Sequence, residues 1–260
     1  MAIVNIDGDL IAYPCAASAE NDTVEIAIQR VDQQMRNIIE QTQSDHYNVY
    51  LSTSSNFRKQ VCAEYKANRT DPPPKFLADC KEFLLTEWNA KVKEWYEADD
   101  LLGINQRSDT ILASFDKDLR MVPGKHYTWE RRGRTKNGDE WIKEAEFFEV
   151  TELEGIKHFY KQMLIGDKTD NVIGIAGLGQ VKSAKLIDPC VDEQEMFDVV
   201  YNLYNDPLRF ASNAMCLWIM REEGETWAHH FLKTQLTCPN HLKPVVEALC
   251  ESTKSFMAIM

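Results

Sequence analysis

Short apolar segments alternate with amphipathic helical patterns through the first half of the chain, and this alternation restricts the possible folds more than any other feature. The strand-like segments are residues 2–6, 48–51 and 110–113. Apolar residues recur at helical spacing over residues 23–42 and 76–88, and Pro72-Pro73-Pro74 prevents an earlier start of the second helix. The pattern predicts an α/β fold with a central, mostly parallel sheet, and such sheets place their sites at the carboxyl ends of strands.

The pattern changes near the middle of the chain. Aromatic residues within 125–148 flank an Asn137-Gly138 turn, which predicts a hairpin and additional edge strands. From Thr151 onward the apolar spacing becomes helical. The expected helices are residues 152–164, 180–187 and others up to 260. Because no low-complexity linker intervenes, we expect an α/β domain over 1–150 packed against a helical domain over 151–260.

The formal net charge of −12 disfavours a nucleic-acid partner when it is taken over the whole chain, because phosphate contacts come from Lys and Arg. Basic residues nevertheless gather locally. They are Arg58, Lys59, Lys66, Arg69 and Lys75, and a second group over residues 131–136. Bound cations would also offset part of any carboxylate cluster, so a nucleic-acid partner remains compatible with the composition.

Membrane and metal-thiol classes are disfavoured. No apolar run is long enough to cross a bilayer, and Asp7 and Asp9 interrupt the one candidate for a secretory signal. We therefore expect a cytoplasmic protein with no membrane partner. The chain has 7 cysteines and no CxxC pair, which predicts reduced thiols and no zinc site.

Acidic residues recur beside apolar segments. The four groups are Asp7; Glu97, Asp99 and Asp100; Asp116 and Asp118; and Asp167 and Asp170. Most acidic pairs are solvated surface charges, and that is the alternative for each pair taken alone. Apolar flanks weaken this alternative, because converging, partly buried carboxylates repel one another unless a cation lies between them. Oxygen ligands without Cys or His indicate Mg²⁺ or Mn²⁺.

The spacing of these acids is compatible with shared ions. Asp116 and Asp118 lie on one face if their segment is extended, and Glu97 and Asp100 are neighbours if theirs is helical. Two cations about 4 Å apart can activate a water and stabilise the leaving oxygen at phosphorus. Phosphodiester hydrolysis is the chemistry that this arrangement favours.

Glycines between two helical patterns form the next motif, over residues 174–185. There the backbone can approach a phosphate, and the following helix presents free N–H groups at its start. The motif predicts a phosphate clamp of the helix-hairpin-helix kind. The alternative is an ordinary glycine-rich turn with surface lysines.

Together the motifs resemble the 5' to 3' exonuclease and flap endonuclease family. They are Asp7-Gly8, Tyr65-Lys66-Ala67-Asn68-Arg69, Glu97-Ala98-Asp99-Asp100, Asp116-Lys117-Asp118, and Gly166-Asp167-Lys168-Thr169-Asp170-Asn171 leading into residues 174–185. The chain looks like a bacteriophage-type member, similar to the 5' nuclease domain of bacterial DNA polymerase I. The resemblance covers residues 1–190, and its motifs are specific only jointly.

The resemblance implies a PIN-like α/β domain with a helical arch near 57–90, joined to an α-helical domain with a helix-three-turn-helix near 156–190. It implies a structure-dependent 5' to 3' DNA exonuclease or flap endonuclease with a two-metal mechanism, in phage DNA replication or recombination. The expected cofactors are two Mg²⁺, replaceable by Mn²⁺, and K⁺ at the helix-three-turn-helix. The expected partner is DNA with 5' ends or 5' flaps, bound by a monomer in the host cytoplasm.

The resemblance also assigns roles to residues. One metal would be held by Asp7, Glu97, Asp99, Asp100 and Asp116, and the second by Asp118, Asp167 and Asp170. The expected catalytic residues are Asp7, Asp99, Asp116, Lys66 and Arg69, the last two on the arch at the scissile phosphate. The expected DNA contacts are Arg58, Tyr65, Lys66, Arg69, Gly177, Gly179, Lys182, Ser183 and Lys185.

Two departures from the family pattern are visible. Many members have another Asp at the end of the second strand, where this chain has Leu51-Ser52-Thr53-Ser54. An Arg common in the helix after the first Asp is also absent, and Tyr13 offers at most a surface on which a base could stack. Compared with the family pattern, the site is therefore expected to lack one carboxylate ligand and one basic contact to phosphate.

Two other functions compete. Asp7-Gly8-Asp9-Leu10-Ile11 approaches the nucleophile loop of haloacid-dehalogenase-like phosphatases, with Asp7 phosphorylated and Asp9 as general acid. That scheme leaves the acids at 97–100 and 116–118 without a role. A catalytically dead binder of branched DNA is the second alternative, and the retained acids argue against it, since carboxylates repel phosphates.

Overall fold

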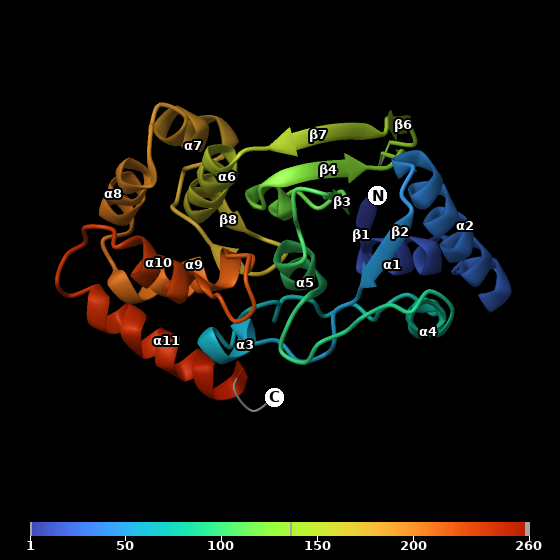
Figure 1. Cartoon of the computed structure of the whole chain (residues 1–260), viewed down its shortest axis with the longest axis horizontal. Helices are drawn as coiled ribbons and strands as arrows, with labels where there is room; N and C mark the ends of the chain where they lie inside the picture. The colour runs from blue at the N-terminus through green and yellow to red at the C-terminus, as the bar shows by residue number, and fades with distance from the viewer. Residues whose placement is uncertain (1, 136, 258–260) are drawn as a thin grey trace.

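The computed structural model describes residues 2–135 and 137–257, so that Lys136, the last residue of the second basic group, lies outside it. Its centre is a five-stranded sheet with the order β2-β1-β3-β4-β7 (Figure 1). The strands are β1 (Ile3–Asp7), β2 (His46–Tyr50), β3 (Thr110–Ala113), β4 (Gly124–Thr128) and β7 (Glu146–Val150). The first four are parallel and β7 is an antiparallel edge. The mostly parallel sheet expected from the sequence is confirmed.

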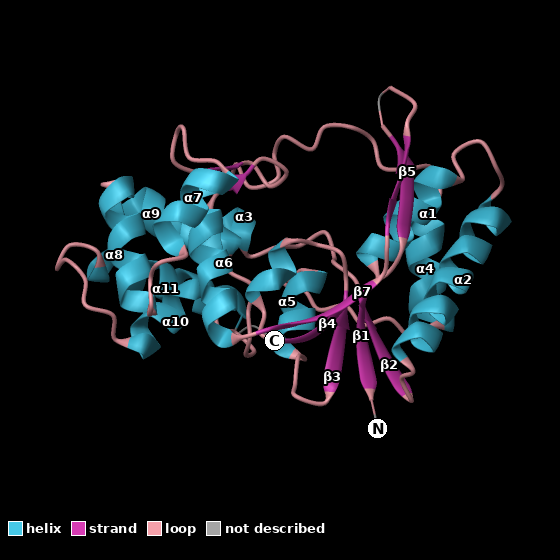
Figure 2. Cartoon of the chain, turned by 90° about the horizontal axis from the view of Figure 1, so that it is seen from above, coloured by secondary structure: helices cyan, strands magenta, loops and turns pink. Residues whose placement is uncertain are grey.

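Helices cover both faces of this sheet. On one face lie α1 (Asp9–Ser18), α2 (Val24–Thr42) and α4 (Leu77–Glu87), which pack on one another (Figure 2). Their apolar stripes, including Val31 and Met35, form one buried core with Val4 and Ile6 of β1. On the other face α5 (Ala98–Ile104) packs against β1 and β2. The order of the strands brings the carboxyl ends of β1, β2 and β3 together.

The second core continues from the sheet into the helical part of the chain. Leu102 of α5 and Leu112 of β3 belong to the same buried cluster as Phe159, Trp218 and Trp227. A shared core buries apolar surface of both parts at once, which stabilises one arrangement of the two. The expectation that the second region packs on the first is confirmed.

The predicted hairpin is present. β5 (Arg131–Arg134) and β6 (Glu140–Lys143) pair antiparallel around the Asn137-Gly138 turn and stand away from the main sheet in Figure 2. Gly138 has a φ of 91°, a conformation that glycine adopts without a steric penalty. The hairpin is therefore a separate ribbon beside the carboxyl ends of the strands.

The expectation of a helical arch near 57–90 is only partly met. The segment holds the one-turn helix α3 (Arg58–Val61) and helix α4, and the residues between them form turns and extended backbone. Lys66 has a φ of 58°, in the left-handed region, and Pro72-Pro73-Pro74 cannot donate helical hydrogen bonds. Lys66 and Arg69 consequently lie on turns, not on a helix.

The helical part begins with a capping box. Thr151 accepts a hydrogen bond from the Glu154 backbone, and the Glu154 carboxylate accepts one from Thr151. The helices are α6 (Glu152–Ile165), α7 (Gln180–Ile187), α8 (Glu193–Tyr204), α9 (Pro207–Leu217), α10 (Trp227–Thr234) and α11 (Lys243–Met257).

Two short strands, which the sequence did not indicate, lie between the expected helices over 152–164 and 180–187. β8 (Gly166–Asp167) and β9 (Val172–Ile173) form a two-stranded ladder between α6 and α7. A Cβ on Gly166 would lie 2.3 Å from the backbone nitrogen of Gly174, so only glycine permits this approach. The ladder holds the acidic segment 167–170 in one conformation.

None of the helices resolved over 2–135 and 137–257 is both long and apolar enough to span a bilayer. All seven cysteines carry free thiols, as expected from their number and spacing.

Candidate active site at the carboxyl ends of the strands

A hollow of about 550 Å³ opens where β1, β2 and β3 end. The acids on its walls are Asp7, Asp9, Glu97, Asp99 and Asp116. The cationic side chains on its walls are Lys59, Lys66, Arg69 and Lys81. Sheet topology thus gathers residues that are more than 100 positions apart in the sequence into one site, and most of them were expected there.

Asp7 is the last residue of β1 and is buried. Its carboxylate accepts hydrogen bonds from the Leu10 backbone at 3.1 Å and from the Ser114 hydroxyl at 2.9 Å. Burial, followed by the negative charge of Asp9, raises the pKa of Asp7 to about 7. Asp7 therefore lies in a place where a carboxylate is poorly solvated and where a cation would be favoured.

Asp99 faces the same hollow from the first turn of α5. Burial, and then the charges of Asp116 and Asp7, raise its pKa well above the ordinary range. Asp7, Asp99 and Asp116 come from three different parts of the chain, and the charge of Asp116 adds to the effect of burial on the other two. Asp7, Asp99 and Asp116 form the carboxylate core of the site.

Asp100 and Arg58 do not face the hollow, which corrects two expectations. The Arg58 guanidinium donates to both Asp100 oxygens at 2.7 Å, and both side chains are buried. Arg58 also donates to the carbonyls of Cys216 and Trp218, at 3.0 and 2.6 Å. Asp100 and Arg58 are therefore paired with each other in this structure and do not line the hollow. Their ion pair joins α3 and α5 to the end of α9.

Glu97 and Asp100 are neighbours at the start of α5, and their contact caps this helix. Glu97 is the N-cap residue, and its backbone N–H donates to Asp100 at 3.1 Å in a capping box. The Glu97 side chain turns toward the hollow, where burial opposes its charge but Lys66 and Arg58 lower its pKa to about 2. Of the expected pair, only Glu97 lines the hollow.

Tyr65 is buried and does not reach a solvent-exposed DNA strand, contrary to expectation. Its hydroxyl lies 2.9 Å from a Glu97 oxygen and 2.7 Å from an Asp170 oxygen. Burial and the two carboxylates raise its pKa well above the ordinary value, so the hydroxyl keeps its proton. Tyr65 orients the acids around it.

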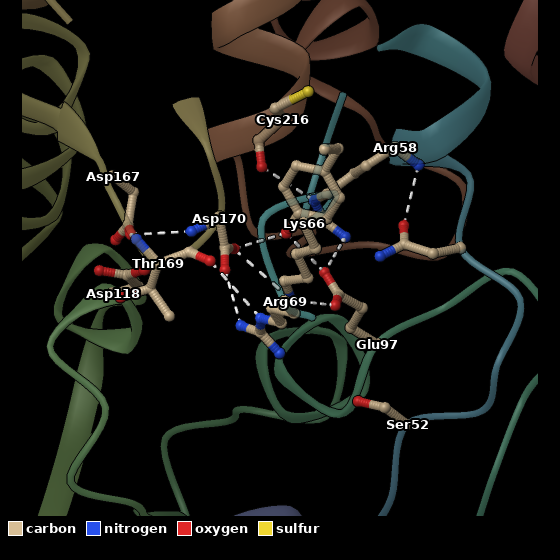
Figure 3. Close-up of polar contacts among 12 residues, drawn as sticks. Ser52, Arg58, Lys66, Arg69, Glu97, Asp118, Asp167, Thr169, Asp170 and Cys216 are labelled. Carbon is tan, nitrogen blue, oxygen red and sulfur yellow. Dashed lines mark hydrogen bonds and ion pairs between the residues drawn. The ribbon is translucent and has the colours of Figure 1, made fainter. Parts of the chain in front are cut away.

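Lys66 and Arg69 point into the site from the turns after α3 (Figure 3). The Lys66 ammonium contacts Glu97 and lies 3.5 Å from Asp170. Arg69 donates to the other Asp170 oxygen at 2.8 Å, and about half of its side chain, 53%, is exposed. Both basic residues therefore lie beside the acids of the hollow.

A second acidic group lies on the far side of Asp116. Asp118 begins the 3-10 helix η1 (Asp118–Met121), so it does not share an extended face with Asp116 as expected. Instead its backbone N–H donates to Asp116 at 2.8 Å. Burial, and next the charge of Asp116, raise the pKa of Asp118 to about 7.

Lys117 joins Asp118 to Asp167. Its ammonium lies 2.5 Å from Asp118 and 2.6 Å from Asp167. Burial opposes ionisation of Asp167, but the hydrogen bond and charge of Lys117 outweigh it and lower the pKa of that carboxyl. The other Asp167 oxygen accepts from the backbones of Thr169 and Asp170 (Figure 3). The sequence had not indicated a role for Lys117.

The donor chemistry of these carboxylates fits divalent cations. Within the described ranges, no three acids, histidines or cysteines converge closely enough to hold a metal ion as they stand. The carboxylates instead share the ammonium groups of Lys66 and Lys117. All donors are oxygens, and burial together with mutual repulsion raises the pKa values of Asp7, Asp99 and Asp118, a cost that a divalent cation would relieve.

Asp9 and Lys81 were missed as members of this site. Asp9 accepts a hydrogen bond from the Ser52 backbone at 2.9 Å and lies 2.6 Å from the Lys81 ammonium. Ser52 is where the second strand lacks the family's carboxylate, so Asp9 brings a carboxylate to that strand end from α1. The only sequence signal was its position two residues after Asp7.

The glycine turn after β9 lies on the surface. Gly177 has a φ of 78°, and a Cβ added to Gly177 or Gly179 would meet nothing. Lys182 in the first turn of α7 and Lys185 in its last turn are exposed. Ser183 is buried, however, and its hydroxyl has no hydrogen-bond partner, so the expected DNA contact at Ser183 is wrong.

Comparisons with known proteins agree with this architecture. Residues 6–152 match the family model described as the 5'-3' exonuclease, N-terminal resolvase-like domain. A 5'-3' exonuclease of Mycoplasma pneumoniae is 28% identical over 211 residues, which cover 70% of this chain and 70% of that protein. DNA polymerase I of Borreliella burgdorferi is 30% identical over 167 residues, 58% of this chain but only 18% of the polymerase.

Solved structures share the fold. A bacteriophage T5 protein co-crystallised with metal ions superimposes with a TM-score of 0.64 at 12% identity, over 99% of this chain and 100% of that one. A bacteriophage T5 flap endonuclease in complex with DNA and metal ions gives a TM-score of 0.62 at 12% identity, over the same shares of the two chains. At this identity the likeness establishes the fold, including both the α/β and the helical parts.

Proposed function

The chain belongs to the 5'-3' exonuclease family, and from that premise we propose that its carboxylate-lined hollow hydrolyses DNA phosphodiester bonds at 5' ends and 5' flaps. One observation carries the proposal. The matched residues 6–152 supply Asp7, Asp99 and Asp116, which line one hollow, and besides burial the charge of Asp116 raises the pKa of both Asp7 and Asp99. Such a cluster suits cations that bind a phosphate, whereas carboxylates alone would repel the backbone of DNA.

Two Mg²⁺ ions, replaceable by Mn²⁺, would supply the activation of a water and the stabilisation of the leaving oxygen at phosphorus. Asp7, Glu97, Asp99 and Asp116 are assigned to the first ion. Asp118, Asp167 and Asp170 are assigned to the second. The two sets are held next to each other, because Tyr65 donates to Glu97 of the first set or Asp170 of the second, and backbone N–H groups orient Asp167.

Lys66 and Arg69 act on the scissile phosphate. Lys66 lies between Glu97 and Asp170, so its charge is held at the mouth of the carboxylate core. When cations neutralise these acids, the Lys66 ammonium is free to turn to a phosphate oxygen and to stabilise charge that develops there. Arg69, which is half-exposed, reaches the neighbouring phosphate.

The glycine turn holds the duplex. Gly177 and Gly179 leave the backbone open, and Lys182 in the first turn of α7 and Lys185 in its last turn provide positive charge. We assign K⁺ to the same turn, and we place the activity in DNA replication or recombination by a monomer. The 26% exposed Asp9 side chain takes the place of the strand-end carboxylate missing at Ser52.

The test is cleavage of a 5'-labelled double-flap DNA and a nicked duplex, with free nitrophenyl phosphate alongside, each in Mg²⁺, Mn²⁺ and EDTA. Metal-dependent release of 5' fragments is expected, and fragment length separates flap cutting from stepwise exonuclease action. Nitrophenol release with intact DNA would replace the nuclease by a phosphatase. Binding of flap DNA without any cleavage would replace it by a binding protein.

A further inference from the structure

A second hollow of about 330 Å³ lies beside the catalytic one. Its walls come from the loop after β3, from η1, from β4 and β7, and from the β5–β6 hairpin. Asp116 lines both hollows, so the second begins where the carboxylate core ends. A strand that leaves the catalytic hollow past Asp116 therefore enters this second space.

Two arginines of the second hollow are held by aromatic rings. The guanidinium carbon of Arg131 lies 4.1 Å from the centre of the Phe115 ring, and that of Arg120 lies 4.7 Å from the centre of the Phe148 ring. Within the described part of the chain, neither guanidinium has a carboxylate oxygen within ion-pair distance. Ring stacking fixes the planes of both groups and leaves N–H donors free in the hollow.

Arg131 has no carboxylate partner among the residues that the structure describes. Its Nε atom is buried and has no hydrogen-bond partner. Burial lowers the pKa of Arg131, and no neighbouring carboxylate opposes that effect. A partly desolvated guanidinium without a partner costs free energy, which an incoming oxyanion would recover.

Two histidines lie close enough to Arg120 to be affected by its charge. Burial, and then the charges of Lys117 and Arg120, lower the pKa of His158 to about 4. Burial also lowers the pKa of His126, and Arg120 adds to the effect. Glu144 and Glu146 line the hollow as well, but neither forms an ion pair with either arginine. The N–H donors of Arg120 and Arg131 therefore remain available to a ligand.

We propose that Arg120 and Arg131 bind a backbone phosphodiester of the DNA strand that continues past Asp116 out of the catalytic hollow. The inference rests on the proposed function and adds a substrate contact to it. A phosphodiester is favoured over a free anion because Asp116 lines both this hollow and the catalytic one. Guanidinium donors match phosphate oxygens in charge and geometry.

The hairpin itself provides a matched control. Arg132 and Arg134 lie on the same ribbon, but they are ion-paired with Glu130 at 2.7 Å and with Glu140 at 2.8 Å. Their side chains are 70% and 73% exposed. Removing these two charges changes the net charge as much as removing Arg120 and Arg131, without touching the hollow.

The experiment compares Arg120→Gln/Arg131→Gln with Arg132→Gln/Arg134→Gln in the full chain. Binding of labelled flap DNA is followed by fluorescence anisotropy in EDTA over a series of salt concentrations, and thermal unfolding checks that both variants fold. Loss of one phosphate contact is expected to reduce the slope of log K against log salt by about 0.9, with the control slope near that of the wild type. Equal slopes for the two variants would overturn the proposal.

Two further arms separate the possible outcomes. Calorimetry with dAMP tests the product as ligand, and loss of dAMP binding in the Gln variant with an unchanged DNA slope would also overturn the strand assignment. Cleavage by the wild type tests the proposed function separately. A wild type that binds DNA with the arginine-dependent slope but never cuts it would contradict the nuclease and leave the phosphodiester site standing. The Gln variant is expected to show a higher KM with little change in kcat.

Discussion

Arg58 and Asp100 form a buried, bidentate ion pair, in which each terminal guanidinium nitrogen lies 2.7 Å from one carboxylate oxygen. The pair sits behind the carboxylate core, and the same arginine also holds two carbonyls at the end of α9. It therefore fixes the helical part of the chain against α5, whose first turn carries Asp99.

Replacing one partner of this pair leaves a buried charge without a counter-ion. For Asp100→Asn we expect the free energy of unfolding to fall by about 3–5 kcal/mol, measured by urea denaturation. Arg134→Gln breaks an exposed pair with Glu140 and should cost about 1 kcal/mol or less. If Asp100→Asn unfolds like the wild type but loses metal affinity, Asp100 is a ligand after all.

Lys66→Ala should lower kcat far more than it raises KM, because the proposed contact with the phosphate strengthens in the transition state. The loss should be about 10²-fold or more in kcat, as for other groups that stabilise developing charge. Lys59→Ala is the control, since Lys59 lines the same hollow and is exposed. A change confined to KM would make Lys66 a residue that only positions DNA.

Asp118→Asn should abolish cleavage while folding and DNA binding persist. The substitution keeps the size of a side chain at the start of η1 and removes a charge that the second ion is proposed to use. Cleavage of labelled flap DNA in Mg²⁺, circular dichroism and anisotropy are the three measurements. Turnover at the wild-type rate would exclude Asp118 from the metal site.

Asp9→Asn should raise the Mg²⁺ concentration needed for half-maximal cleavage, because Asp9 supplies the carboxylate beside the Ser52 backbone. Adding Ser52→Asp to this variant should restore much of the lost metal affinity, since the new carboxylate would start from the same strand end. Titration calorimetry with Mn²⁺ gives a readout that is independent of cleavage. If Asp9→Asn and the wild type bind Mn²⁺ alike, Asp9 serves only to hold Lys81.

His158 should make the fold sensitive to acid. Burial and the charges of Lys117 and Arg120 lower its pKa to about 4, and its Nε2 atom is buried without a hydrogen-bond partner. The folded chain therefore keeps His158 neutral, whereas the unfolded chain takes up a proton below about pH 6.5. This contribution to stability is complete above that pH and is lost as the pH falls toward 4, by up to about 1.4 kcal/mol per unit.

The measurement is urea denaturation of the wild type and of His158→Gln between pH 7.5 and 5. Asp7 and Asp118, whose pKa values are raised to about 7, titrate in the same range and act in the opposite direction. The relevant quantity is therefore the free energy of unfolding of the wild type minus that of His158→Gln at each pH. It should shrink as the pH falls, and a difference independent of pH would mean that His158 is not buried in the neutral form.

Much of this protein could be predicted from local sequence. The apolar runs ending at Asp7 and before Asp116 predicted parallel strands with acids at their carboxyl ends, and the structure places both acids in one hollow. The Asn137-Gly138 turn likewise predicted the hairpin. These features depend on neighbours within a few residues, where spacing and backbone preference suffice to decide the conformation.

Only the tertiary structure decided which charged residues are catalytic and which are structural. In the sequence Asp99 and Asp100 are adjacent acids, yet one faces the hollow and the other is sealed against Arg58, 42 positions away. The glycine motif similarly could not show that Ser183 points into the core. The reason is physical: burial and partnership of a charge are set by contacts between segments distant in the chain, and no pattern along a single segment records them.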